Sequence, residues 1–267
     1  MQDQAVLYYA GILNRLSLGW PQVVEEPCGK NILVLSPHPD DDVFACGGTL
    51  MKHGSDDSEI TSIYLTDGSK GGVVSGPDKD LVREREREAR SAGELLGIKR
   101  QIFLRHVDQE LRATDDTVAE VRQLFSEIRP DLVYVPFVID GFYHRDHMET
   151  NRLLAGVAGG YQHTFKCCAY EVYSPLIPNT VVDITRQMDL KVTAMRIFQT
   201  QLAVKDYLGA IVSLNRFRGL TFSVAGSTKF MEAFFCIDSC AYCELLRLVL
   251  AWIRGGMNED PDVCERR

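Results

Sequence analysis

Residues 31–42, which read NILVLSPHPDDD, decide the fold because they join an apolar run of strand length to a cluster of charged side chains. His38 and the three aspartates at 40–42 follow the apolar residues directly, and CGGTL at 46–50 then leads into an expected helix. Burying one imidazole beside three carboxylates is costly unless solvent or a metal ion holds them. We therefore interpret this segment as a buried strand that ends in a ligand-rich loop.

A second ligand-rich loop follows another apolar run. Residues 131–137 read DLVYVPF, and the motif HRDH occupies residues 144–147. In open parallel sheets, ligands bind beyond the carboxyl ends of the strands. Two such loops, each placed after a strand, are how an α/β fold assembles a metal site, so the sequence predicts a metal-dependent enzyme.

The composition is that of an ordinary globular protein. The 267 residues are 45% hydrophobic and 25% charged, which suits one large α/β domain or two small ones. A net charge of −8 and a pI near 5.3 argue against nucleic acid as a partner. No apolar stretch reaches the roughly 20 residues that span a bilayer, no secretory signal is recognisable, and the eight cysteines are unevenly spaced. We expect a cytoplasmic protein without a membrane span.

Strand and helix patterns alternate along the first two thirds of the chain. They predict an α/β fold, with a Rossmann-like, mainly parallel sheet and helices on both faces. The expected strands are 31–36, 59–65, 101–104, 131–137 and 166–173, and the expected helices are about 44–53, 79–97, 117–129 and one after His147.

After residue 175 the alternation ends, and we expect a C-terminal elaboration of the same single domain. Its expected elements are a short strand at 181–184, two consecutive helices within 186–217, a strand at 230–236 and a helix at 241–253. The predicted domain spans 1–257, with a core of about 30–175, an elaboration of about 176–257, and a polar tail at 258–267.

Three residues of the two loops can converge on one metal ion. His38, Asp41 and His147 supply two imidazoles and one carboxylate, a common catalytic zinc set that leaves a position open for water. Such an ion lowers the pKa of water toward ~7 and polarises a carbonyl. A further carboxylate can act as general base, and a second histidine, if protonated, can stabilise an oxyanion. The two loops contain a candidate for each role.

The motifs SPHPDDD at 36–42 and HRDH at 144–147 resemble those of the PIG-L/LmbE-type family of zinc-dependent N-acetyl-sugar deacetylases. The resemblance extends over about residues 31–150. It implies one divalent metal ion, zinc first and iron(II) as the alternative, on the three ligands named above. By the same resemblance Asp40 would be the general base, His144 would face the oxyanion, and Asp146 would orient His144 or tune its pKa.

The resemblance also implies two substrate contacts, at Arg85 and Asp108. Arg85 lies in an alternating charge run at 83–88, which by itself is typical of a solvated helix face. Two positions depart from the family pattern, because Asp42 and Ser69 each stand where the family has a glutamate. We expect the carboxylate of Asp42 only to support its loop, whereas Ser69 puts the identity of the substrate in question.

The implied reaction is the hydrolytic removal of an N-acetyl group from a small amino-sugar or glycoconjugate substrate. The same chemistry on a non-sugar N-acyl amide is the alternative, and a non-catalytic sugar- or nucleotide-binding module is a rival of another class. A polar rim around the cleft would favour the sugar, and an apolar rim would favour the non-sugar amide. The sequence leaves the oligomeric state open, and a homo-oligomer is compatible with it.

Several residues also admit structural interpretations. Asp40 can be a loop carboxylate, Asp146 an N-cap, and His144 a hydrogen-bond partner of a ligand. The spacing CxxxCxxC that begins at Cys236 occurs in radical enzymes with iron–sulfur clusters. Cysteines before an apolar helix, however, often behave as small core residues.

Overall fold

The apolar run after residue 30 forms an interior strand of an eight-stranded sheet in the computed structural model, which describes residues 21–55, 58–71, 79–223 and 229–257. The strands are β1 (Gln22–Val24), β2 (Asn31–Ser36), β3 (Glu59–Thr66), β4 (Arg100–His106), β5 (Leu132–Pro136), β6 (Lys166–Tyr170), β7 (Thr180–Asp183) and β8 (Met231–Asp238). Their order is β1-β7-β8-β6-β5-β2-β3-β4. Neighbouring strands are parallel, except that β8 runs antiparallel to β6 and β7. The predicted mainly parallel sheet is confirmed.

The strand order reverses beside β2. The chain runs outward from β2 to β3 and β4, and then returns to the other side of β2 as β5. Ligands of open α/β sheets bind at such a point, beyond the carboxyl ends of the strands. The topology therefore places the two charged motifs, one after β2 and one after β5, next to each other.

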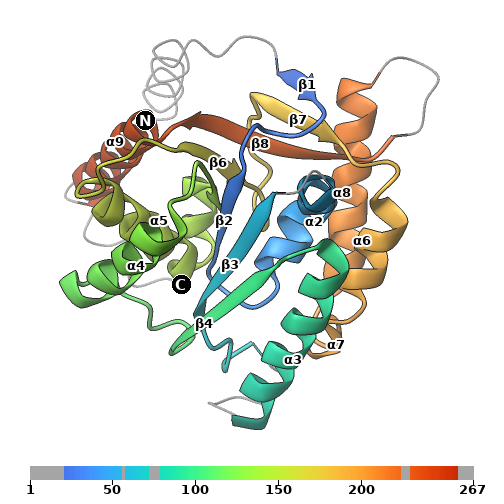
Figure 1. Ribbon diagram of the computed structural model, residues 1–267, viewed down its shortest axis with the longest axis horizontal. Coiled ribbons are helices and arrows are strands. Elements are labelled where there is room, and N and C mark those ends of the chain that lie inside the picture. Colours follow the sequence, from blue (N-terminus) through green and yellow to red (C-terminus); the bar gives the residue numbers. More distant parts are fainter. Residues whose placement is uncertain (1–20, 56–57, 72–78, 224–228, 258–267) are drawn as a thin grey trace.

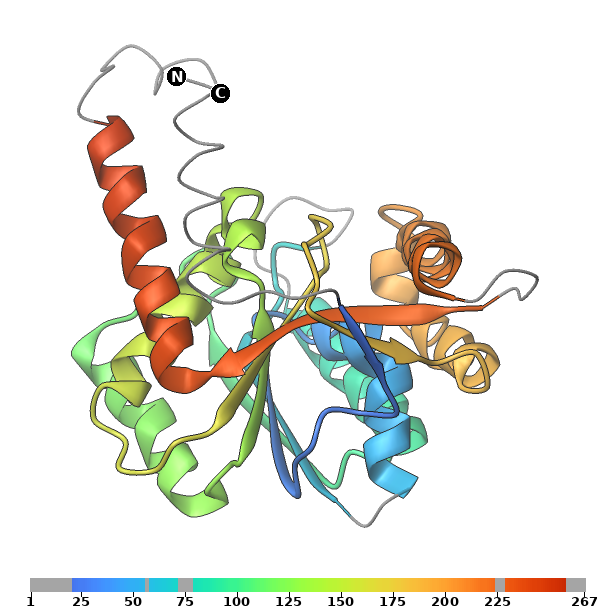
Figure 2. The same cartoon turned by 90° about the horizontal axis from the view of Figure 1, so that it is seen from above.

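Two layers of helices cover the sheet, as Figures 1 and 2 show. On one face lie α2 (Asp41–Ser55), α3 (Lys79–Leu96), α6 (Met188–Met195), α7 (Gln199–Leu202) and α8 (Tyr207–Phe222). On the other lie α4 (Asp115–Ile128), α5 (Arg145–Ala158) and α9 (Ser239–Met257). In β2, Ile32 and Val34 pack into one core, and Leu33 and Leu35 into the other. A strand buried on both faces explains the unbroken apolar run.

The structure corrects the expected elements in three places. The segment 186–217 contains three helices rather than two, because the four-residue α7 separates α6 from α8. Helix α5 begins at Arg145, so His147 lies in its first turn rather than before it. Strand β1 and the 3-10 turn η1 (Val138–Phe142) have no counterpart among the expected elements, and β1 is defined by pairing with β7, which no local pattern reveals. The predicted tail at 258–267 lies outside the described residues.

The three cysteines of the CxxxCxxC spacing do not form a cluster site. Cys236 forms a disulfide with Cys168, which lies opposite it on the antiparallel strand β6. Cys240 and Cys243 are free thiols near the start of α9. Sequence spacing does not predict this disulfide, because its partners are 68 residues apart and meet only through strand pairing.

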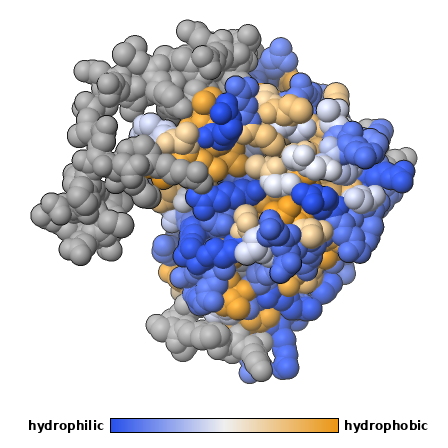
Figure 3. All heavy atoms as spheres, turned by 90° about the vertical axis from the view of Figure 1, so that its left-hand side faces the viewer, coloured by the Kyte–Doolittle hydropathy of each residue, from blue (hydrophilic) through white to orange (hydrophobic). Residues whose placement is uncertain are grey.

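The surface is mixed in character. Figure 3 shows hydrophilic residues over much of one face, with hydrophobic residues in small groups between them. Large exposed hydrophobic residues, such as Leu220 on α8 and Trp252 on α9, lie on different elements. In the part of the chain that the structure describes, no helix has both the length and the apolar character needed to cross a membrane.

A buried ion pair joins the C-terminal elaboration to α2. Lys191 Nζ lies 2.6 Å from Glu232 Oε1, and both side chains are 0% exposed. The Glu232 carboxylate also accepts hydrogen bonds from the backbone N–H groups of Gly48 and Thr49, at 2.8 and 2.7 Å, within α2. The segment after residue 175 is therefore tied to the helix that begins in the first charged motif.

Replacing Lys191 with methionine should lower the free energy of unfolding by about 3 kcal/mol, because the loss of one partner leaves the other charge buried and uncompensated. Chemical denaturation measures the change. Lys229→Met is the matched control, since Lys229 pairs with Asp183 where the side chains are 38% and 28% exposed. Its loss should cost less than about 1 kcal/mol. Equal losses in the two variants would contradict the prediction.

Candidate active site

The loops after β2 and β5 bring together the three residues predicted to bind metal. Asp41 Oδ2 lies 3.1 Å from Nδ1 of His38 and 3.5 Å from Nε2 of His147. All three side chains are buried. His38 and Asp41 lie where β2 gives way to α2, and His147 lies in the first turn of α5. The three residues therefore meet around the Asp41 carboxylate at the point where the strand order reverses.

The second ring nitrogen of His38 faces two further carboxylates. His38 Nε2 lies 3.3 Å from Asp146 Oδ2 and 3.4 Å from Asp108 Oδ1. Asp146 also accepts a hydrogen bond from the backbone N–H of Gln109 at 2.7 Å. No hydrogen bond joins Asp146 to His144 among the described residues, although the charge of Asp146 raises the pKa of His144. A carboxylate behind a metal-binding histidine orients the ring and sets its tautomer, so Asp146 and Asp108 are placed to act on His38.

Asp140 is a residue of this cluster that the sequence did not reveal. Its side chain is fully buried, and its Oδ2 lies 3.7 Å from Nδ1 of His147. It belongs to η1, in a stretch that reads VIDGF and contains no ligand spacing. The only signal in the sequence was a single aspartate between a strand and a motif, which is too common in loops to indicate a role.

Negatively charged carboxylates surround the buried imidazole of His38. Burial alone would lower the pKa of His38, but Asp108, Asp146 and Asp41 together raise it well above its ordinary value. Burial would raise the pKa of Asp41, yet His147 and His38 lower it to about 2. An arrangement of carboxylates that holds a proton on a buried imidazole also favours a metal cation in its place.

The donor atoms fit a divalent metal ion. Ligand atoms of His38, His144 and His147 lie within 4.8 Å of one another. Both ring nitrogens of His147 and one carboxylate oxygen of Asp146 are buried without a hydrogen-bond partner among the described residues. Buried polar atoms are nearly always paired. A cation bound by nitrogen and oxygen donors would satisfy part of this set.

Asp40 lies beside the cluster and pairs with Arg85. Its Oδ2 is 3.1 Å from the Arg85 guanidinium, which also donates a hydrogen bond to the carbonyl of Gly68 at 2.9 Å. Burial raises the pKa of Asp40 to about 6, and the positive charge of Arg85 opposes that rise. Arg85 is only 2% exposed, whereas Arg83 and Arg87 of the same charge run are exposed. The interpretation of Arg85 as part of a solvated helix face is therefore wrong.

His144 packs among other rings. Its ring centre lies 4.4 Å from that of His38, and it stacks on Tyr173 at 5.8 Å with 12° between the ring planes. Burial and repulsion from His38 and His147 lower the pKa of His144 to about 4. The lowered pKa favours the neutral imidazole. It offers an N–H donor rather than a full charge.

The two departures from the family pattern have separate consequences. Asp42 accepts hydrogen bonds from the hydroxyls of Tyr64 and Ser62, at 2.7 and 2.9 Å, and from the backbone N–H of Val43. It therefore supports the loop, and the shorter side chain reaches its partners. Ser69 is buried, and its hydroxyl has no hydrogen-bond partner among the described residues. That position supplies no carboxylate to a substrate.

A cavity of about 440 Å³ opens over the cluster. Its lining includes five of the predicted site residues, namely His38, Asp40, Arg85, Asp108 and His144. Three tyrosines also line it, at positions 143, 173 and 207. Tyr143 is 67% exposed, so it does not serve to fill the core. The cavity gives a small molecule access to the buried cluster.

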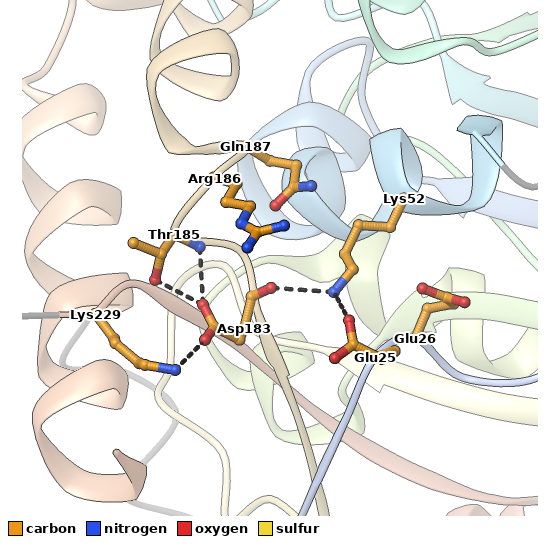
Figure 4. Close-up of a pocket in the computed structure, with 8 residues that line it drawn as sticks. All are labelled: Glu25, Glu26, Lys52, Asp183, Thr185, Arg186, Gln187 and Lys229. Carbon is orange, nitrogen blue, oxygen red and sulfur yellow. Dashed lines mark hydrogen bonds and ion pairs between the residues drawn. The ribbon is translucent and has the colours of Figure 1, made fainter. Parts of the chain in front are cut away.

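A larger hollow, of about 670 Å³, has a different character. Figure 4 shows that several of its charged side chains pair with one another. Lys52 lies 2.9 Å from Glu25, and Lys229 lies 2.5 Å from Asp183. Its described lining contains no histidine, and two of its acidic groups already have basic partners across the hollow. We therefore assign the site to the smaller cavity above His38.

Comparison with known proteins agrees with this assignment. The PIG-L family model, described as GlcNAc-PI de-N-acetylase, matches residues 33–158. The chain is 33% identical over 193 residues to the diacetylchitobiose deacetylase of Thermococcus kodakarensis, and the match covers 64% of this chain and 70% of that protein. It is also 25% identical over 201 residues to the 4-oxalmesaconate hydratase of Pseudomonas putida, a match that covers 67% of this chain and 76% of that protein.

A solved structure shows the same fold. The N,N'-diacetylchitobiose deacetylase from Pyrococcus horikoshii matches with a TM-score of 0.68 at 23% identity. The match covers 89% of this chain and 94% of that chain. The shared fold therefore extends well beyond the segment that contains the two motifs.

Removing the Tyr64 hydroxyl tests whether Asp42 is a supporting residue. Tyr64→Phe should lower the free energy of unfolding by about 2 kcal/mol, because a hydrogen bond to a buried carboxylate is lost. Its metal content should equal that of the wild type. Tyr161→Phe is the control, since that hydroxyl donates to a backbone carbonyl at 3.2 Å in a partly buried setting, and should cost below about 1 kcal/mol. Loss of metal from Tyr64→Phe would instead place Asp42 among the metal-binding residues.

Proposed function

The chain belongs to the PIG-L family of de-N-acetylases, and on that premise we propose that it is a metal-dependent hydrolase. It removes the N-acetyl group from a small amino-sugar or glycoconjugate substrate. One observation carries the proposal. The imidazoles of His38 and His147 both lie beside the Asp41 carboxylate, beneath a cavity that Asp40 and His144 line.

We propose that His38, Asp41 and His147 hold one divalent metal ion, with zinc as the first candidate and iron(II) as the second. Two imidazoles and a carboxylate suit either ion. When bound, the ion would polarise the amide carbonyl and lower the pKa of a water molecule. The chain's own carboxylates and imidazoles must then move the protons and stabilise the developing charge.

Asp40 is the proposed general base. It takes a proton from the water molecule as the water oxygen bonds to the amide carbonyl carbon, and it later returns the proton to the departing amine. A carboxyl pKa of about 6 suits both directions near neutral pH. Arg85, at 3.1 Å, keeps the carboxylate ionised and restricts its position.

His144 is the proposed partner of the oxyanion. It lines the cavity, its ring is held against Tyr173, and it is neutral in the resting site. An N–H donor aimed at the developing oxygen charge stabilises the transition state more than the substrate. As the carbon–nitrogen bond breaks, acetate and a free amine are released.

The cavity lining favours a sugar over an apolar acyl amide. Val204 is the one aliphatic side chain in its described lining, and the rest is charged, polar, tyrosine or glycine. Arg85 and Asp108 are the proposed contacts for sugar hydroxyls. Asp108 also faces His38 at 3.4 Å, so the same carboxylate lies between the substrate and a metal ligand. The net charge of −8 argues against nucleic acid as a partner.

Acetate release and metal content, measured together on purified protein, test the proposed function. Wild type should bind about one zinc or iron(II) ion per chain and release acetate from an N-acetyl amino sugar such as diacetylchitobiose. Asp40→Asn should keep the metal and lose about 10²–10⁴-fold in kcat. Hydration of 4-oxalmesaconate without acetate release would favour the hydratase chemistry of the Pseudomonas relative. A wild type without metal would overturn the proposal.

The pH dependence of kcat/KM tests the pairing of Asp40 with Arg85. Asp40 must be ionised to accept a proton, so activity should rise with pH through about 6. Because the positive charge of Arg85 lowers the Asp40 pKa, Arg85→Met should move this acidic limb upward by about 1–3 pH units. Arg87→Met is the control, since Arg87 is exposed and pairs with Glu84. An unshifted limb in Arg85→Met would assign the limb to another group.

A further inference from the structure

Asp140 connects two parts of the site that come from distant segments. One oxygen, Oδ2, faces Nδ1 of His147 at 3.7 Å and accepts backbone N–H groups of Val172 and Tyr173 at 3.0 and 3.3 Å. The other, Oδ1, accepts the N–H of Ser174 at 2.8 Å. The carboxylate thus touches both a proposed metal ligand and the loop that follows β6.

The burial of Asp140 argues for a specific role. Its side chain is 0% exposed, with no lysine or arginine paired to it among the described residues. Ionised carboxylates at such depth are costly unless hydrogen bonds or nearby charges compensate. Three N–H donors from one loop supply that compensation on one side. His147 is the group that faces the remaining side.

The Asp140 carboxylate lies beyond hydrogen-bond distance of Nδ1 of His147, at 3.7 Å, but close enough for its charge to favour one tautomer of the imidazole. Nε2 of His147 faces Asp41, where the metal is proposed, and Nδ1 faces Asp140. A negative charge beside Nδ1 favours the proton on that nitrogen, which leaves the lone pair of Nε2 free to bind a metal ion. The opposite tautomer would place a proton where the ion must bind.

The loop held by Asp140 carries a substrate-facing side chain. Tyr173 stacks on His144 and lines the cavity. A second buried carboxylate, Glu171, holds the far end of this loop, because it accepts the N–H of Leu176 at 2.8 Å and pairs with Arg218 at 2.6 Å. Within the described part of the chain, Glu171 makes no hydrogen bond or ion pair with the imidazole of His147. The loop therefore has two anchors, and only Asp140 also faces a metal ligand.

We propose that Asp140 is a positioning residue that holds His147 in its metal-binding tautomer and fixes the loop of Tyr173 over His144. This inference rests on the proposed metal site. It predicts that metal affinity and the order of the substrate-facing loop depend on one carboxylate, whereas Glu171 affects the loop alone.

Competition with a chromophoric chelator for Zn²⁺, on the full-length chain, tests the proposal without any substrate. Asp140→Asn should weaken zinc binding by about 10–100-fold, the usual effect of losing a carboxylate behind a ligand histidine. Glu171→Gln, the matched loop control, should stay within about threefold of wild type because it leaves the carboxylate behind His147 in place. Wild-type affinity in Asp140→Asn, or equal losses in both variants, would overturn the inference.

A measurement on the wild type serves if Asp140→Asn fails to fold. Nitrogen-15 NMR of histidine side chains in the zinc-loaded protein should show His147 with Nδ1 protonated and Nε2 bound to metal. The reverse arrangement would overturn the inference while leaving the proposed hydrolase intact. A wild type that binds no zinc would overturn both proposals, and acetate release plays no part in either readout.

Discussion

The site depends on holding several carboxylates together in a buried space. Asp41, Asp108 and Asp146 surround the imidazole of His38, and their combined charge raises its pKa against the effect of burial. Such a cluster is stable only if a cation, in the form of a proton or a metal ion, lies among the carboxylates. Both the folding of the two loops and the proposed metal chemistry follow from this requirement.

Other buried polar groups hold the surroundings of this cluster in place. Asp42 accepts hydrogen bonds from Tyr64 and Ser62 beneath the first loop. Glu232 binds backbone N–H groups within α2 and pairs with Lys191, so the C-terminal elaboration supports the helix that starts at the site. Polar networks of this kind specify one arrangement because each unsatisfied member would be costly. A loop built this way keeps its ligands aligned before any ion binds.

Prediction from the sequence succeeded where residues act close to their own strand and failed where partners are remote. Arg85 illustrates the difference, because its charge run indicates a solvated helix, while the tertiary structure buries it against Asp40. Asp146 faces His38 rather than His144, since the start of α5 points it across the sheet toward the loop after β2. Asp140 was not predicted because a single aspartate in a loop indicates no role, and the backbone N–H groups that bind it lie more than 30 residues away.

The sequence by itself determined the mainly parallel sheet and the two ligand-rich loops, because apolar periodicity and strand-end motifs are local properties. The two motifs also predict His38, Asp41 and His147 as metal ligands, because each motif follows a strand and ligands bind beyond the carboxyl ends of parallel strands. The folded structure was needed to show which nitrogen faces which carboxylate, which arginine is buried, and that burial lowers the pKa of His144. Those properties depend on distances between remote segments and on burial, and neither is encoded in the spacing of residues along the chain.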